Sequence, residues 1–173
     1  MSFENLGTIP YRNQITSLPL SYFAEKWFIA QAKKLKIIAK NPRLETVRSV
    51  LKQHLKHKFD RVENCWIQNP DDPTEYLDLI LKCDCILTLE NKQGKTIRVA
   101  VDITLNPYSA KDKKHEIGGI NFDNARKALG IDRHWIIVLP KGFFEKLNIN
   151  NSIIDRVYQA VDSRNKVQVL TVS

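Results

Sequence analysis

The chain has 173 residues, of which 43% are hydrophobic and 27% charged, a length and composition that fit one soluble domain with a full core. Its formal net charge is +8, and no apolar run approaches the ~18 residues that a membrane span requires. The N-terminus lacks the basic start and apolar core of a signal peptide, and three cysteines argue against a disulfide framework. We therefore expect a cytoplasmic protein.

The basic residues are concentrated in the first part of the chain. Residues 1–70 hold 12 Lys or Arg and 5 Asp or Glu, whereas residues 71–173 hold 15 and 14. A local surplus of this kind favours a polyanionic partner, nucleic acid first and an anionic membrane second. The alternative is a solvated basic face that only keeps the protein soluble.

Residues 1–20 are predicted to form an irregular arm, because they contain Pro10 and Pro19. Ser21 is a suitable cap for a helix through residue 40, which the Asn41-Pro42 pair ends. A second helix, residues 42–57, has apolar residues at spacings of three and four on one face. Another face carries a basic stripe, for which we expect contacts with the phosphate backbone: Arg48, Lys52 and Lys56.

The remaining patterns predict a mixed α/β sheet domain. Strands are expected over residues 59–67, 76–89, 96–105, 134–140 and 167–172, and helices over residues 121–129 and 153–161. We interpret residues 1–173 as one domain. It would comprise the arm, the basic helices (21–57), a central core (58–140) and a C-terminal helix and strand (141–173).

The strands over residues 76–89 and 96–105 form a predicted hairpin whose register can be derived. If Lys92, Gln93 and Gly94 form a three-residue loop, Gly94 takes the left-handed position that such loops require. Counting back from that loop, Asp84 lies opposite Asp102. The same register places Lys82 opposite Thr104, on the same face of the sheet.

Two carboxylates in directly opposed positions repel one another. They require a shared proton or a cation, and Mg²⁺ is commonly held by one or two carboxylates. Both aspartates stand between apolar residues, in KCDCIL and AVDITL, which disfavours simple capping at a strand end. The pair therefore predicts a divalent metal site at Asp84 and Asp102.

These residues resemble the motif of the PD-(D/E)XK nuclease superfamily, which has the restriction-endonuclease-like fold. Its core runs helix, three-strand meander, helix and strand, here preceded by an extra N-terminal helix. Asp84 matches the aspartate of the second strand, and Asp102-Ile103-Thr104 falls where the acid-x-lysine triplet belongs. The resemblance covers about residues 42–140 and implies a Mg²⁺ cofactor, with Mn²⁺ as a substitute, bound by Asp84, Asp102 and the Ile103 carbonyl or the Thr104 hydroxyl.

Thr104 occupies the position where the family has its lysine. Because members of the superfamily also take this lysine from other positions, we expect Lys82 to replace it, with Lys113 or Lys114 as the fallback. Many members carry a glutamate on the helix before the first strand. Glu45 fits that place best, and Glu25 is the second choice.

The resemblance implies a Mg²⁺-dependent DNA endonuclease of the restriction, homing, resolvase or transposon-end type. Its partner would be double-stranded DNA, gripped by the basic stripe and by a basic loop after the second hairpin strand: Lys111, Lys113 and Lys114. Cutting both strands favours a homodimer or higher symmetric oligomer. The alternative is a non-catalytic DNA-binding accessory protein on a degenerate nuclease fold, acting in recombination or element excision.

Overall fold

The computed structural model describes residues 19–146 and 149–173, so the predicted arm lies almost wholly outside it. Its helices are α2 (Pro19–Lys34), α3 (Leu44–His54), α4 (Lys56–Cys65), α5 (Pro73–Tyr76), α6 (Pro107–Ile117), α7 (Ile120–Ala128) and α8 (Ile149–Val161). A π-helical turn, η3 (Leu77–Leu81), follows α5, and a 3-10 turn, η4 (Phe143–Glu145), precedes α8. The strands are β1 (Cys85–Glu90), β2 (Thr96–Thr104), β3 (Arg133–Val138) and β4 (Val167–Thr171).

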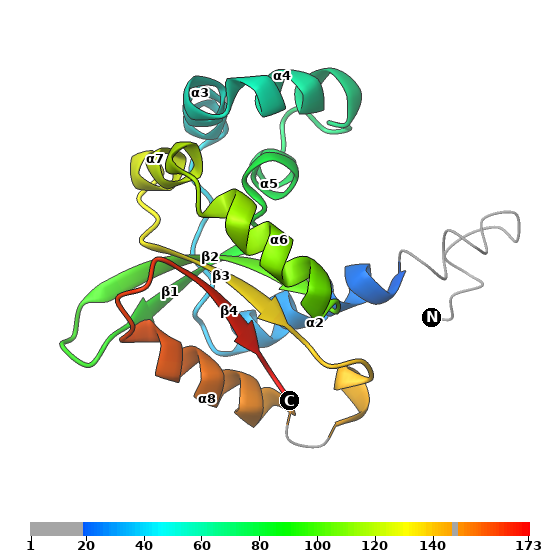
Figure 1. Ribbon diagram of the computed structural model, residues 1–173, viewed down its shortest axis with the longest axis vertical. Coiled ribbons are helices and arrows are strands. Elements are labelled where there is room, and N and C mark those ends of the chain that lie inside the picture. Colours follow the sequence, from blue (N-terminus) through cyan, green and yellow to red (C-terminus); the bar gives the residue numbers. More distant parts are fainter. Residues whose placement is uncertain (1–18, 147–148) are drawn as a thin grey trace, which may run out of the picture.

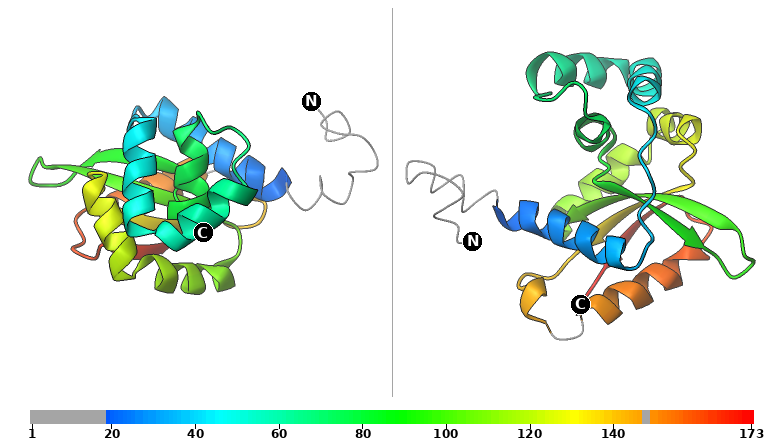
Figure 2. Two further views of the ribbon diagram at one scale, coloured as in Figure 1. Left: turned by 90° about the horizontal axis from the view of Figure 1, so that it is seen from above. Right: turned by 180° about the vertical axis from the view of Figure 1, so that it is seen from behind.

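The four strands form one open sheet in the order β1-β2-β3-β4. β1 and β2 are antiparallel, and the other two pairings are parallel. Helices lie on both faces of the sheet (Figures 1 and 2). The mixed α/β class expected from the sequence is therefore confirmed. None of the helices in the described ranges is long and apolar enough to cross a membrane.

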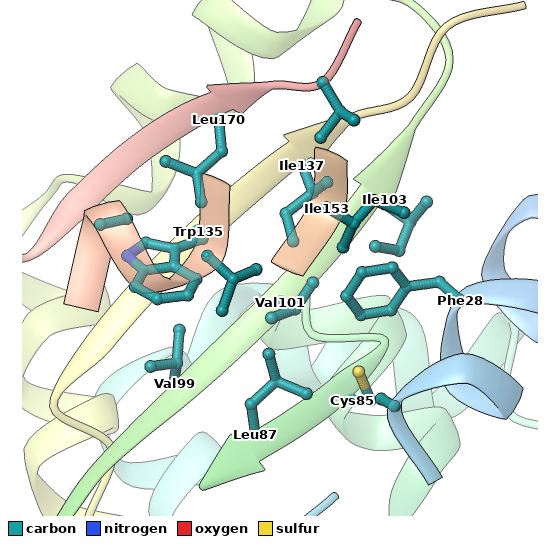
Figure 3. Packing of buried hydrophobic residues seen from close by; sticks show 14 of the residues in the cluster. Phe28, Cys85, Leu87, Val99, Val101, Ile103, Trp135, Ile137, Ile153 and Leu170 are labelled. Atoms are coloured by element: carbon teal, nitrogen blue, oxygen red, sulfur yellow. The ribbon is translucent and has the colours of Figure 1, made fainter. Parts of the chain in front are cut away.

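The sheet separates two hydrophobic cores. Alternate strand residues such as Val101 and Trp135 pack with α2 and α8, through Phe28 and Ile153 respectively (Figure 3). Strand residues on the other face, among them Ala100 and Ile136, pack with the helices from α3 to α7. Since side chains alternate along a strand, Asp102 and Thr104 share the face of Ala100.

The predicted hairpin register is confirmed. Cys85 pairs with Val101, and the pairing continues to Glu90 opposite Thr96. The Asn91 N–H donates to the Lys95 carbonyl at 2.9 Å, and Gly94 has a φ of 78°. A glycine without a Cβ takes this left-handed conformation without strain.

The predicted strand over residues 59–67 is wrong, because these residues belong mainly to α4. Phe59 and Val62, three residues apart, are buried against the helical layer, whereas a strand would place them on opposite faces. The single predicted helix over residues 42–57 is also divided. Leu55 leaves the helical conformation, with φ −128° and ψ 43°, between α3 and α4.

The antiparallel neighbour on the outer edge of β1 is instead a short segment after α2. The Ala39 N–H donates to the Ile86 carbonyl at 2.8 Å, and the Thr88 N–H donates to the Ile37 carbonyl at 2.7 Å. Ile38 and Leu87 form the bridge between them. The helices α3, α4 and α5 are thus inserted between this segment and β1.

Two further segments near the hairpin differ from the prediction. Residues 77–81 form the π-helical turn rather than strand, and Lys82 ends it with a left-handed φ of 63°. The predicted basic loop after β2 is helix α6. Its start was signalled in the sequence, since Asn106 caps the N–H groups of Tyr108 and Ser109 and Pro107 stands at the first position.

Candidate metal-binding and catalytic site

Asp84 and Asp102 meet where the hairpin strands lie over the helical layer. The confirmed register, continued by one residue beyond β1, places Asp84 opposite Asp102. The Asp84 N–H donates to the Val101 carbonyl, and its Oδ2 accepts the Ile103 N–H, both at 2.7 Å. The side chains are buried, with Asp84 8% and Asp102 5% exposed. The backbone of β2 therefore holds the Asp84 carboxylate beside that of Asp102.

A lysine from α6 completes this arrangement. The Nζ of Lys113 lies 3.1 Å from Oδ2 of Asp102. Helix α6 begins three residues after β2 ends and runs back over the sheet, which brings its second turn above Asp102. Lys113 was the fallback for the missing motif lysine. The structure brings it to the aspartates as an ion-pair partner.

Two more carboxylates face the pair. Asp78 comes from the π-helical turn and Glu25 from α2, and both contribute repulsive charge at Asp84. Glu25 was the second choice among the glutamates, and Asp78 was missed. The only sequence signal for Asp78 was an acid within the apolar run LDLIL, which was interpreted there as part of a strand.

Burial and the charges of these acids raise the pKa values of Glu25, Asp84 and Asp102. Burial, and then the charges of Asp78 and Asp102, raise the pKa of Glu25 from 4.5 to about 7. Burial, and then the charge of Glu25, also raise the pKa of Asp84 well above its usual value. Burial raises the pKa of Asp102, while the Lys113 ammonium opposes that shift. Without a bound cation, burying these acids together therefore lowers the stability of the folded protein.

We expect Glu25 and Asp84 together to lower the stability of the metal-free protein as the pH rises from about 5 to 7.5. Buried His134, whose pKa is lowered to about 3, contributes in the opposite direction below pH 6.5. Between pH 4.5 and about 7, Glu25 ionises in the unfolded chain but stays protonated in the folded protein. The folded state then binds more protons, so the free energy of unfolding falls with rising pH. The raised pKa of Asp84 acts in the same direction. Urea denaturation in EDTA across this range measures the slope.

The matched variant is Glu25→Gln, in which this slope should be smaller. Adding Mg²⁺ at pH 7.5 should recover the stability lost by the wild type, because a ligand that binds only the folded state stabilises it. An unchanged slope in Glu25→Gln would contradict the electrostatic description of the site, because the contribution of His134 is the same in both proteins.

The residues fit a divalent cation held mainly by two carboxylates. Oδ2 of Asp102 is buried and accepts no well-aligned hydrogen bond, although it is paired in charge with Lys113. Within residues 19–146 and 149–173, no three His, Cys, Asp or Glu side chains already have the mutual spacing of a metal site. Mg²⁺ commonly uses one or two carboxylates and completes its shell with water and substrate phosphate. Asp84 and Asp102 meet that requirement.

Three residues of the predicted site lie differently from expectation. Lys82 is not on a strand opposite Thr104; it is the left-handed corner after η3. The Thr104 hydroxyl is buried and accepts the Asn106 N–H at 3.1 Å, which ties it to the turn before α6. The side chain of Glu45 is 71% exposed and pairs with Arg43, so the structure does not bring Glu45 to the aspartates. The Ile103 carbonyl remains a predicted ligand.

Lys58 is a buried cation near the site that the sequence did not indicate. It comes from α4, and its Nζ is buried without a hydrogen-bond partner, 3.8 Å from Glu116 and 5.4 Å from the centre of the Phe122 ring. Burial, and then the neighbouring charge of Lys82, lower the pKa of Lys58 to about 8. The positive charge of Lys58 and Lys82 therefore lies on the helical side of the aspartates.

The predicted basic stripe is not one continuous surface. Arg48 lies on α3, where its guanidinium is 2.6 Å from Glu63 and 5.6 Å from the centre of the Tyr76 ring. Lys52 is exposed on α3, and Lys56, exposed on α4, pairs with Asp60 at 2.6 Å. Lys111 and Lys114 are exposed on α6, on the face away from Lys113. They line an open hollow with His115 and the Gly118-Gly119 backbone.

We expect Arg48→Ala to destabilise the fold by about 1 kcal/mol, because Arg48 packs on two aromatic rings and pairs with Glu63. Its effect on DNA affinity should be smaller than that of Lys52→Ala, whose exposed side chain has no such packing. Lys52→Ala should change stability by less than about 0.5 kcal/mol. Urea denaturation measures the stability of both variants, and a DNA titration measures their affinity. If Arg48→Ala lowered DNA affinity more than Lys52→Ala while leaving stability unchanged, Arg48 would be a DNA contact.

A mainly apolar hollow lies elsewhere. It has a volume of about 280 Å³ between α2 and α8 and is lined by residues that include Phe28, Leu35, Ile153 and Tyr158, with no carboxylate among them. It belongs to the opposite face of the sheet from Asp84 and Asp102.

Comparison of the chain with protein-family models, curated proteins and solved structures gave no match. The interpretation of the site therefore depends on its geometry and electrostatics.

Proposed function

We propose that the protein is a Mg²⁺-dependent DNA endonuclease of the PD-(D/E)XK type. The observation that carries the proposal is the pair of buried, opposed carboxylates of Asp84 and Asp102, with the Lys113 ammonium 3.1 Å from Asp102. Mutual repulsion makes this arrangement costly at neutral pH, because without a bound cation the Asp84 carboxyl must stay protonated well above its usual pKa. Exposed lysines such as Lys52, Lys111 and Lys114 would supply the attraction for DNA.

The order of elements supports the same proposal. Helix α2 carries Glu25, and the segment around Ile38 pairs antiparallel with β1. Hairpin β1-β2, helices α6 and α7 and the parallel strand β3 follow. This order corresponds to the helix, three antiparallel segments, helix and strand of the nuclease core, with α3, α4 and α5 as an insertion and α7 as an additional helix before β3. Glu25, rather than Glu45, then stands on the helix before the first strand.

Under this proposal, each residue of the site has a separate role. Asp84 and Asp102 would hold the cation, which when bound would polarise the phosphodiester and acidify a water. Lys113 would orient the attacking water and balance negative charge that develops at the phosphate. The hydrogen bond from the Ile103 N–H fixes Oδ2 of Asp84, and the carboxyl also makes side-chain hydrogen bonds with Asp78 and Asp102, which a bound cation would replace. Exposed lysines such as Lys52, Lys111 and Lys114 would position the duplex.

The direct test is a plasmid-nicking assay with Mg²⁺, Mn²⁺ or EDTA, comparing the wild type with Asp102→Ala. We expect metal-dependent cutting that the variant loses while it still binds DNA. The control is Asp155→Asn, which alters an exposed acid on α8. DNA binding by the wild type with neither cutting nor Mg²⁺ binding by calorimetry would favour the non-catalytic DNA-binding protein instead.

A further inference from the structure

A chain of buried hydrogen bonds lies behind the site and joins three elements of the fold. The guanidinium of Arg126, on α7, donates from Nη1 to the Ile117 carbonyl at 2.7 Å. The same Nη1 lies 3.3 Å from Nδ1 of His134, on β3, and Nε2 of His134 lies 2.9 Å from the Lys82 carbonyl. Arg126 is 3% exposed and His134 is 0% exposed.

The partners determine which nitrogen of His134 carries the proton. A guanidinium only donates hydrogen bonds, so Nδ1 must accept from Arg126. Nε2 then carries the hydrogen and donates to the Lys82 carbonyl. Burial, and also the charge of Arg126, lower the pKa of His134 to about 3. The ring is therefore neutral, in one tautomer, at any ordinary pH.

This chain ends beside both halves of the candidate site. Lys82 is the left-handed corner two residues before Asp84, and its conformation sets the direction in which the chain enters β1. Ile117 is the last residue of α6, one turn after Lys113. The position of the Asp84 carboxylate relative to the Lys113 ammonium thus depends on the contacts of His134 and Arg126.

We propose that His134 is a positioning residue, which aligns Asp84 with Asp102 and Lys113 by bridging the Arg126 guanidinium and the Lys82 carbonyl. Only the expected effect on metal affinity rests on the proposed function. The alignment of Asp84 exists in the metal-free protein and can be measured there. A ring so placed need not touch the substrate to determine whether the carboxylates can share a cation.

The first test uses NMR of the metal-free full chain. The Ile103 amide, which donates to Asp84 Oδ2, should change its chemical shift and exchange faster in His134→Leu. His134→Gln, which can still accept and donate, should restore both. The control is Val167→Ala, which leaves a cavity beside His134 on β4 and on the same face of the sheet; it should leave the Ile103 amide unchanged. An unaltered Ile103 amide in His134→Leu would overturn the proposal.

If His134→Leu does not fold, two measurements decide. In the wild type, ¹⁵N shifts should show the neutral tautomer with the proton on Nε2; a proton on Nδ1 would overturn the proposal. In His134→Gln, the Ile103 amide should keep its wild-type protection. A Gln variant that is as stable as the wild type but has lost this protection would likewise overturn it.

The last test is Mn²⁺ or Mg²⁺ affinity by calorimetry. We expect His134→Leu to bind the cation about 10–100-fold more weakly, with DNA affinity in EDTA unchanged and His134→Gln intermediate. Equal cation affinity in a folded His134→Leu protein would overturn the proposal. Absence of cation binding by the wild type would instead refute the proposed function, and the amide and tautomer measurements would still decide the role of His134.

Discussion

Asp84→Asn should stabilise the metal-free protein at pH 8 and at the same time abolish metal-dependent cleavage. The amide oxygen of Asn can still accept the Ile103 N–H that binds Asp84 at 2.7 Å. At pH 8 the raised pKa of Asp84 keeps its carboxyl protonated in the folded protein, at a free-energy cost because the unfolded chain ionises there. Asn is neutral in both states and removes this cost. We expect a gain of about 0.5–2 kcal/mol in the free energy of unfolding, measured by urea denaturation in EDTA.

The same substitution removes a carboxylate that the proposed function assigns to the cation, so Mg²⁺ binding by calorimetry and plasmid nicking should both be lost. Opposite signs for stability and activity are what a site of repelling carboxylates requires, whereas a substitution that merely damages the fold would lower both. Asp155→Asn, on the exposed face of α8, should leave both quantities as in the wild type. A destabilised Asp84→Asn protein would mean that Asp84 serves the fold rather than a cation.

Lys113→Met should reduce the single-turnover cleavage rate by about 10²–10⁴-fold, the range typical of a lost catalytic acid-base or orienting group. DNA affinity should change little, because the side chain is turned inward to Asp102 and is only 29% exposed. Lys82→Ala should have a much smaller effect on the rate, since the structural contribution of Lys82 is its backbone carbonyl.

Rapid-quench measurements at saturating DNA separate the rate from binding. The control is Lys141→Met, which removes an exposed charge after β3. If Lys82→Ala proved as damaging as Lys113→Met, Lys82 would also take part in the chemistry, as the sequence predicts. If both variants cut like the wild type, neither lysine takes part in the chemistry.

Local sequence signals predicted most of the sheet. The Lys92-Gln93-Gly94 loop determined the hairpin register, because a left-handed glycine allows only certain pairings and each pairing is then counted from the loop. Strand β3 was predicted from its continuous apolar run, and α7 and α8 were predicted as helices over residues 121–129 and 153–161. The opposition of Asp84 and Asp102 could therefore be derived before any tertiary contact was known.

The same signals failed where helix and strand compete in short apolar runs. Phe59 to Ile67 was predicted as strand, although Phe59 and Val62 have the spacing of a helix face that packs in the helical layer. Residues 77–81 have strand-like composition but form a π-helical turn. The antiparallel neighbour of β1, around Ile38, is held by two hydrogen bonds and has too little pattern of its own to be recognised.

The sequence by itself determined the class of the fold, the hairpin and the pair of buried aspartates, because all three depend on side-chain alternation and turn chemistry within about twenty residues. Only the tertiary structure decided which lysine and which further acids join the pair. Lys113 approaches Asp102 because α6 folds back over the sheet, and Glu25 and Asp78 approach from elements far from β2 in the chain. Such encounters depend on how helices pack on the sheet, which no local pattern encodes.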